Sequence, residues 1–106
     1  MLDRNAVIET VRNYARDIES HGVHLREVIL FGSFAKGTQT EWSDIDVALV
    51  ADEFTGWYLD DKKLFPYVGI KKPYTRIEAQ TYSTDYFKQG DPFINEIVKT
   101  GVKVNP

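Results

Sequence analysis

The stretch EVILFGSFAKGTQTEWSDIDVALVA, residues 27–51, decides the fold of this chain. It opens with a short apolar run typical of a strand, which Gly32 cuts off. A second such run begins at Ile45. Because residues two apart on a strand share a face, Ile45, Val47 and Leu49 are expected to pack into a core. The stretch therefore predicts two buried strands joined by a loop that begins with Gly-Ser.

The loop after the first run carries groups that suit a phosphate. Gly32 has no side chain, so an anion can approach its backbone, and the N–H groups that open the following helix point at that anion. Ser33 adds a hydroxyl donor, and Lys36 adds a mobile positive charge. The loop predicts a phosphate cradle, against the alternative that Gly-Ser is an ordinary turn.

Two carboxylates follow, at the start of the second run. Asp44 and Asp46 flank Ile45, so strand alternation places both carboxylates on one face. Like charges at this spacing destabilise each other unless a cation neutralises them, and Mg²⁺ prefers such hard oxygen ligands. The pair predicts a magnesium site beside the loop, against the alternative of a solvated strand end.

Together these motifs resemble a known family. The run from Gly32 to Gly37, leading to Ser43 through Val47, resembles the signature of the DNA polymerase β-like nucleotidyltransferase superfamily. Within that superfamily the chain is most similar to the minimal nucleotidyltransferases, small proteins that often act as antitoxins of HEPN-domain toxins. The resemblance implies a third carboxylate on a later strand, and Glu78, between Ile77 and Ala79, matches that pattern.

The resemblance also implies a mechanism. An acceptor hydroxyl would attack the α-phosphate of a nucleoside triphosphate in line, and pyrophosphate would leave. Asp44, Asp46 and Glu78 would be the catalytic carboxylates and would hold two Mg²⁺ ions, which such sites keep about 3.5 to 4 Å apart. Gly32 and Ser33 would hold the β- and γ-phosphates. The remaining nucleotide contacts implied are Lys36 and Ser43.

The same resemblance suggests the substrates. The nucleotide would be ATP, with AMP transferred to a tyrosine hydroxyl on a HEPN-type toxin partner, so that the protein acts as an antitoxin. Two alternatives stay open. One is a binding antitoxin with a vestigial nucleotide site. The other is a nucleotidyltransferase of the antibiotic-modifying type, assembled as a homo-oligomer.

Composition sets the remaining limits. We expect one nucleotidyltransferase domain over residues 1–106, because 42% hydrophobic residues suffice for one modest core. The net charge of −3 argues against a nucleic-acid partner. Zero cysteines exclude disulfides and thiolate metal sites. No apolar run approaches membrane length and no signal-peptide core follows Met1, so we expect no membrane partner and a cytoplasmic location.

The rest of the chain completes an α/β fold. We expect a small mixed sheet of strands near residues 26–32, 45–51 and 76–82, flanked by helices. Residues 56–65 predict a short helix whose aromatic side chains are either core or a platform for a base or partner. Asp3 is the expected N-cap of a first helix that Gly22 terminates, and Ser83 or Thr84 is expected to cap a later turn. A last helix is expected to begin at Asp91-Pro92 and to end at Gly101. Residues 102–104 are a candidate edge strand.

Overall fold

The computed structural model describes residues 3–105 and contains a mixed sheet in the order β3-β2-β1-β4. β2 pairs antiparallel with β1 and parallel with β3, while β4 pairs antiparallel with β1. The α/β fold with a small mixed sheet is therefore confirmed. In chain order, the strands are β1 (Leu25–Phe31), β2 (Ile45–Ala51), β3 (Ile77–Ser83) and β4 (Val102–Lys103).

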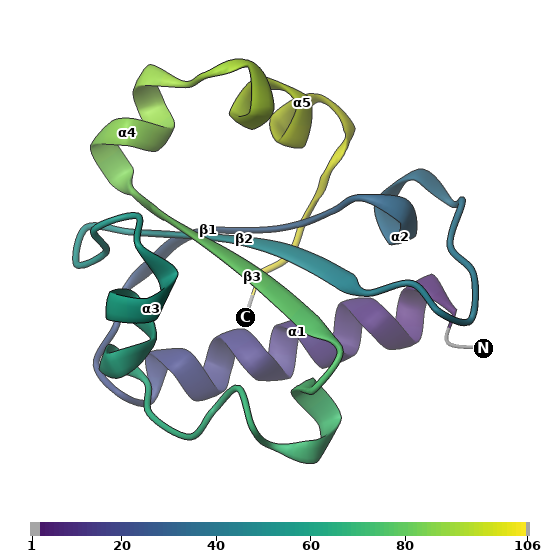
Figure 1. Cartoon of the computed structure of the whole chain (residues 1–106), viewed down its shortest axis with the longest axis horizontal. Helices are drawn as coiled ribbons and strands as arrows, with labels where there is room; N and C mark the ends of the chain where they lie inside the picture. Colours follow the sequence, from purple (N-terminus) through teal and green to yellow (C-terminus); the bar gives the residue numbers. More distant parts are fainter. Residues whose placement is uncertain (1–2, 106) are drawn as a thin grey trace.

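Helices cover both faces of this sheet, as Figure 1 shows with α1 on one side and α4 and α5 on the other. Three of these helices begin at side-chain caps, where a carboxylate or hydroxyl accepts a bond from a free N–H of the first turn. The predicted caps Asp3, Ser83 and Asp91 are all confirmed. The helices are α1 (Arg4–Glu19), α2 (Ser33–Lys36), α3 (Tyr58–Asp61), α4 (Thr84–Gln89) and α5 (Pro92–Thr100).

The predicted boundaries differ from the structure mainly at four elements. β1 and β3 are each displaced by one residue, so β1 ends at Phe31, and Gly32, which was predicted to cut it off, is also the N-cap of α2. α1 ends at Glu19, because the following residues form a turn that Gly22 completes with a φ of 93°. The helix expected over residues 56–65 is split into α3 and a 3-10 helix, Lys62–Leu64, because Phe65 turns into the core and Pro66 cannot extend a helix.

The core lies mainly between α1 and the sheet. As predicted, Ile45, Val47 and Leu49 point into it and are fully buried. On the opposite face a smaller apolar cluster includes Ile29 and Ala48, packed under Ile97 of α5. That smaller cluster includes no residue from the first three positions of β2 or β3, and there Asp46 is half-buried and Glu78 exposed.

The aromatic side chains of the segment between β2 and β3 divide between the two predicted environments. Phe65 is buried, whereas Trp57 is 75% exposed and Tyr67 is 78% exposed. The core interpretation is therefore right for Phe65 and wrong for the other two. In residues 3–105, no helix is long and apolar enough to cross a membrane.

Candidate active site

The three predicted carboxylates come together at one corner of the sheet. Asp46 and Glu78 are register partners on the parallel strands β2 and β3, so their side chains leave the same face side by side. Asp44 lies immediately before β2, two residues from Asp46 and close enough to Glu78 for the two charges to interact. This is the face opposite α1, at the end that the apolar cluster leaves open.

Mutual repulsion shows in the titration of these groups. The negative charge of Asp44, a hydrogen bond with that side chain and a smaller effect of Asp46 raise the pKa of Glu78 above its usual value. Partial burial, followed by the charge of Asp44, raises the pKa of Asp46. Glu78 and Asp46 are thus harder to ionise, mainly because of the Asp44 charge for Glu78 and mainly because of burial for Asp46, and a nearby cation would favour their charged forms.

Glu78→Gln will raise the melting temperature of the metal-free protein modestly near pH 7. A carboxyl group whose pKa is higher in the folded state lowers stability as pH rises through that pKa. Below the unfolded-state value of 4.5 both states are protonated, so the gain should vanish near pH 3. Thermal melts in EDTA at the two pH values check this. An equal gain in melting temperature at both pH values would mean that Glu78→Gln acts through packing and not through removal of a charge.

Gly32 lies directly against the Asp46 carboxylate. A Cβ atom built on Gly32 would stand 2.3 Å from Oδ2 of Asp46, and its φ of 73° is strained for any other residue. Phe31, the residue before it, is the register partner of Asp46 on β1. The positive φ and the nearby Asp46 carboxylate both favour glycine here, and the missing side chain also leaves room for a phosphate.

The loop predicted to hold phosphate starts the short helix α2. Gly32 is its N-cap, no side chain caps its first turn, and Ser33 is its first residue. Lys36 is its last residue, with Nζ 3.8 Å from Oε1 of Glu96 on α5, and both side chains are about half exposed. Such an ion pair is weak, so the ammonium group is free to move toward an anion.

Arg76, two residues before Glu78, belongs to the site although the sequence did not single it out. Its guanidinium donates to the backbone carbonyls of Glu41, at 3.2 Å, and Ser43, while its own carbonyl accepts from Ile45 N at 2.9 Å. Arg76 thus holds the residues on both sides of Asp44. Only the spatial return of the chain to β3 reveals this contact, so the local sequence held no signal for it.

The predicted Ser43 hydroxyl has a structural role in the same loop. Its Oγ accepts a hydrogen bond from Thr40 N at 2.9 Å, and Ser43 N donates to Thr40 O at 3.1 Å. These bonds close the turn that delivers Asp44 to the start of β2. The hydroxyl supports the position of the carboxylate and keeps one lone pair for a ligand.

The carboxylates suit a hard divalent cation, although they do not form a finished cage. In residues 3–105, no three histidine, cysteine, aspartate or glutamate side chains converge as a preformed metal-binding group. Asp44 and Glu78 lie close enough for their charges to interact, and Asp46 lies against Gly32. Only carboxylate oxygens are present here, which is the donor set that Mg²⁺ prefers, and the repulsion between them would fall when it binds.

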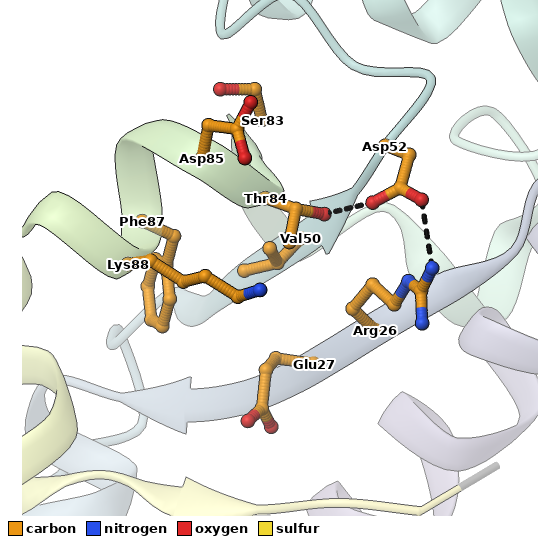
Figure 2. Close-up of a pocket in the computed structure, with 9 residues that line it drawn as sticks. All are labelled: Arg26, Glu27, Val50, Asp52, Ser83, Thr84, Asp85, Phe87 and Lys88. Atoms are coloured by element: carbon orange, nitrogen blue, oxygen red, sulfur yellow. Dashed lines mark hydrogen bonds and ion pairs between the residues drawn. The ribbon is translucent and has the colours of Figure 1, made fainter.

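A cavity of about 540 Å³ lies elsewhere, at the far end of the sheet. Figure 2 shows Arg26 bound to Asp52, Asp52 bound to Thr84, and Lys88 pointing into the same space. The cavity adjoins Val50, four residues beyond Asp46 on β2, or about 13 Å along the strand. Within this cavity Arg26 and Asp52 form an ion pair, and none of the three carboxylates lines it, so it is not the site to which they belong.

Comparisons with known proteins agree with this geometry. The family profile described as "Nucleotidyltransferase domain" matches residues 8–104. No curated protein matches the chain. A solved structure described as a "putative nucleotidyltransferase" from Sulfolobus solfataricus is similar in fold, with a TM-score of 0.66 and 18% identity over 94% of this chain and 80% of that one. The chain belongs to the nucleotidyltransferase domain family, within the polymerase β-like superfamily.

Proposed function

We propose that this nucleotidyltransferase moves AMP from ATP to a hydroxyl group in a magnesium-dependent reaction. One observation carries the proposal: Asp46 and Glu78 are register partners on parallel strands, Asp44 lies just before one of those strands, and Gly32 lies against Asp46. That arrangement joins a candidate metal site to a candidate phosphate loop without any intervening side chain. Membership in the family supports transfer of a nucleotide in general.

Each group would have a separate task. Asp44, Asp46 and Glu78 would hold Mg²⁺, which when bound offsets the triphosphate charge and makes the acceptor hydroxyl a better nucleophile. Gly32 and Ser33 would receive the β- and γ-phosphates on the uncapped first turn of α2. Lys36 and Ser43 would add a charge and a hydroxyl at the edge of the same corner.

For the acceptor, we infer a tyrosine on a HEPN-type toxin, which the protein would silence as an antitoxin. The support is the resemblance to minimal nucleotidyltransferases, together with surface properties of this chain. The segment between β2 and β3 exposes several large apolar side chains, which favours contact with another protein. Those that are at least two-thirds exposed are Trp57, Leu59, Tyr67 and Ile70.

A binding antitoxin without catalysis is the second candidate. It is favoured by the finding that the carboxylates in the described part of the chain are not preassembled around a metal position. Under that function the protein would neutralise its partner by covering a surface. The acids would then be dispensable for inhibition.

Incubation with Mg²⁺, α-labelled ATP and a HEPN-type protein tests the proposal. We expect label on a tyrosine of the partner, located by mass spectrometry, and loss of the partner's toxicity in step with labelling. Complex formation and inhibition without label would establish the binding antitoxin. Label on an aminoglycoside with no partner present would instead assign the chain to small-molecule modification.

Arg76→Gln will raise the Mg²⁺ concentration needed for half-maximal transfer by roughly 10-fold. Residues that orient metal ligands typically contribute 10- to 100-fold to metal affinity or activity, and Arg76 holds the loop that presents Asp44. Initial rates across a magnesium titration measure the effect. Arg16→Gln, an equal charge change on the exposed side of α1, should leave the titration unchanged. Identical curves for both variants would remove Arg76 from this role.

A further inference from the structure

A second cavity of about 540 Å³ opens on the same face of the sheet as the carboxylates. Tyr82, which lines it, lies four residues beyond Glu78 on β3, so the two side chains share a face about 13 Å apart. Gln80 lies between them on that face and is exposed. The cavity is lined by Thr55, Gly56, Trp57, Tyr82, Ser83, Tyr86 and Asp91.

Aromatic rings dominate this cavity, which we name the aromatic pocket. The rings of Tyr82 and Tyr86 are parallel, with centroids 6.3 Å apart. The Tyr86 hydroxyl donates to Asp91 at 2.6 Å, which fixes that ring, and Trp57 adds an indole that is 75% exposed. Exposed aromatic faces held in place offer stacking surfaces to a planar ring.

The polar groups of the aromatic pocket are largely engaged with the protein itself. Thr55 and Gly56 donate to the buried Asp61 carboxylate, which holds the loop that presents Trp57. The Asp91 carboxylate accepts from Tyr86 and from Ile94 N. The ring faces are therefore the principal feature left for a ligand. A pocket of this volume is in the range of small-molecule sites.

We propose that the aromatic pocket binds the nucleobase of the triphosphate whose phosphates lie at Gly32 and the three carboxylates. This inference rests on the proposed function. Glu78, Gln80 and Tyr82 lie along one face of β3. A triphosphate with its reacting phosphate at Glu78 could therefore extend along this strand and place its base at the aromatic rings. A nucleobase can bind by stacking alone, because every base has a π-face. Stacking therefore explains why the pocket is aromatic although few of its hydrogen-bond donors are free.

Binding measurements on Trp57→Ala test this assignment. Trp57 is largely exposed, so its removal leaves the core intact. Mg²⁺-ATP and Mg²⁺-tripolyphosphate, which lacks a base, are titrated against the wild type and the variant by calorimetry. Leu59→Ala, at a side chain 69% exposed but outside the pocket, is the matched control. In a Trp42→Phe background, Trp57 is the sole tryptophan and its fluorescence reports stacking directly.

We expect Trp57→Ala to raise the Kd for Mg²⁺-ATP roughly 5- to 100-fold, the range for one base–aromatic stack, with tripolyphosphate binding unchanged. ATP should also quench Trp57 fluorescence. If Trp57→Ala binds ATP as tightly as the wild type but transfers AMP to the acceptor more slowly, the assignment is overturned. The pocket would then bind the acceptor and not the nucleobase. Quenching by adenosine without any binding of tripolyphosphate would support the pocket and count against the proposed phosphate site instead.

Discussion

Replacing Asp44 and Asp46 together by asparagine will lower kcat/KM for nucleotidyl transfer by roughly 1000-fold or more. The substitutions remove two of the three carboxylates that would hold the cation, and stabilisation of transferring phosphates by such charges accounts for several kcal/mol of the reaction barrier. Initial rates of AMP transfer from labelled ATP measure the loss. The variant should remain folded, because burial and the nearby Asp44 charge already disfavour ionised Asp46.

Single charge changes elsewhere separate this effect from a general loss of negative charge. Asp60→Asn and Asp85→Asn each neutralise an exposed aspartate away from the corner, and both should transfer AMP at the wild-type rate. Substantial transfer by the double variant would remove Asp44 and Asp46 from catalysis. If the double variant loses transfer but still fully neutralises a toxin partner, the two acids are catalytic in the wild type. Inhibition of the partner then depends on binding and not on transfer.

Much of the fold follows from short-range pattern. The run Ile45–Ala51 is apolar except for Asp46 and is bounded by Asp44 and Asp52, so its strand limits were predicted without error. The caps Asp3, Ser83 and Asp91 accept hydrogen bonds from N–H groups three residues away. Because both partners are close in sequence, such caps can be predicted from the local sequence. Where the chain crosses from β2 to β3, local pattern left both environments open for the aromatic side chains, and only the structure shows that Phe65 is buried and Trp57 exposed.

The candidate site divides in the same way. Gly32, Asp44 and Asp46 lie within one loop and strand start, so their proximity could be predicted, and the parallel pairing of Asp46 with Glu78 adds the third acid. Arg76 acts on a loop more than 30 residues earlier, as the separation of its hydrogen bonds shows. No periodicity encodes such a contact, because it depends on how the crossover returns the chain.

Asp61 is the clearest case of a residue whose burial cannot be predicted from the neighbouring sequence. It stands in an Asp-Asp doublet that suggests a solvated helix end, yet Asp61 is only 2% exposed while Asp60 is exposed. Its carboxylate accepts four hydrogen bonds of 2.7–3.0 Å, which join the loop after β2 to β3. The donors are Thr55 N, Thr55 Oγ, Gly56 N and Thr81 Oγ.

Asp61→Ala will lower the free energy of unfolding by about 3 kcal/mol. Buried Thr81 loses its partner altogether, whereas the Thr55 and Gly56 groups can in part bind water at the surface, which keeps the cost below the sum of four lost bonds. Urea denaturation followed by circular dichroism measures the change. The matched variant Asp60→Ala should differ from wild type by less than about 0.5 kcal/mol.

Asp61→Asn sharpens the interpretation, since the amide keeps the shape of the side chain and one acceptor oxygen. We expect a loss between those of the two alanine variants, because one pair of donors keeps an acceptor and the other pair meets an NH₂ group. The loop that Asp61 holds also carries Trp57, so the asparagine variant should weaken Mg²⁺-ATP binding while leaving Mg²⁺-tripolyphosphate binding intact. Equal stability of Asp61→Ala and Asp60→Ala would mean that water replaces the carboxylate without cost, and that the loop is held by its backbone alone.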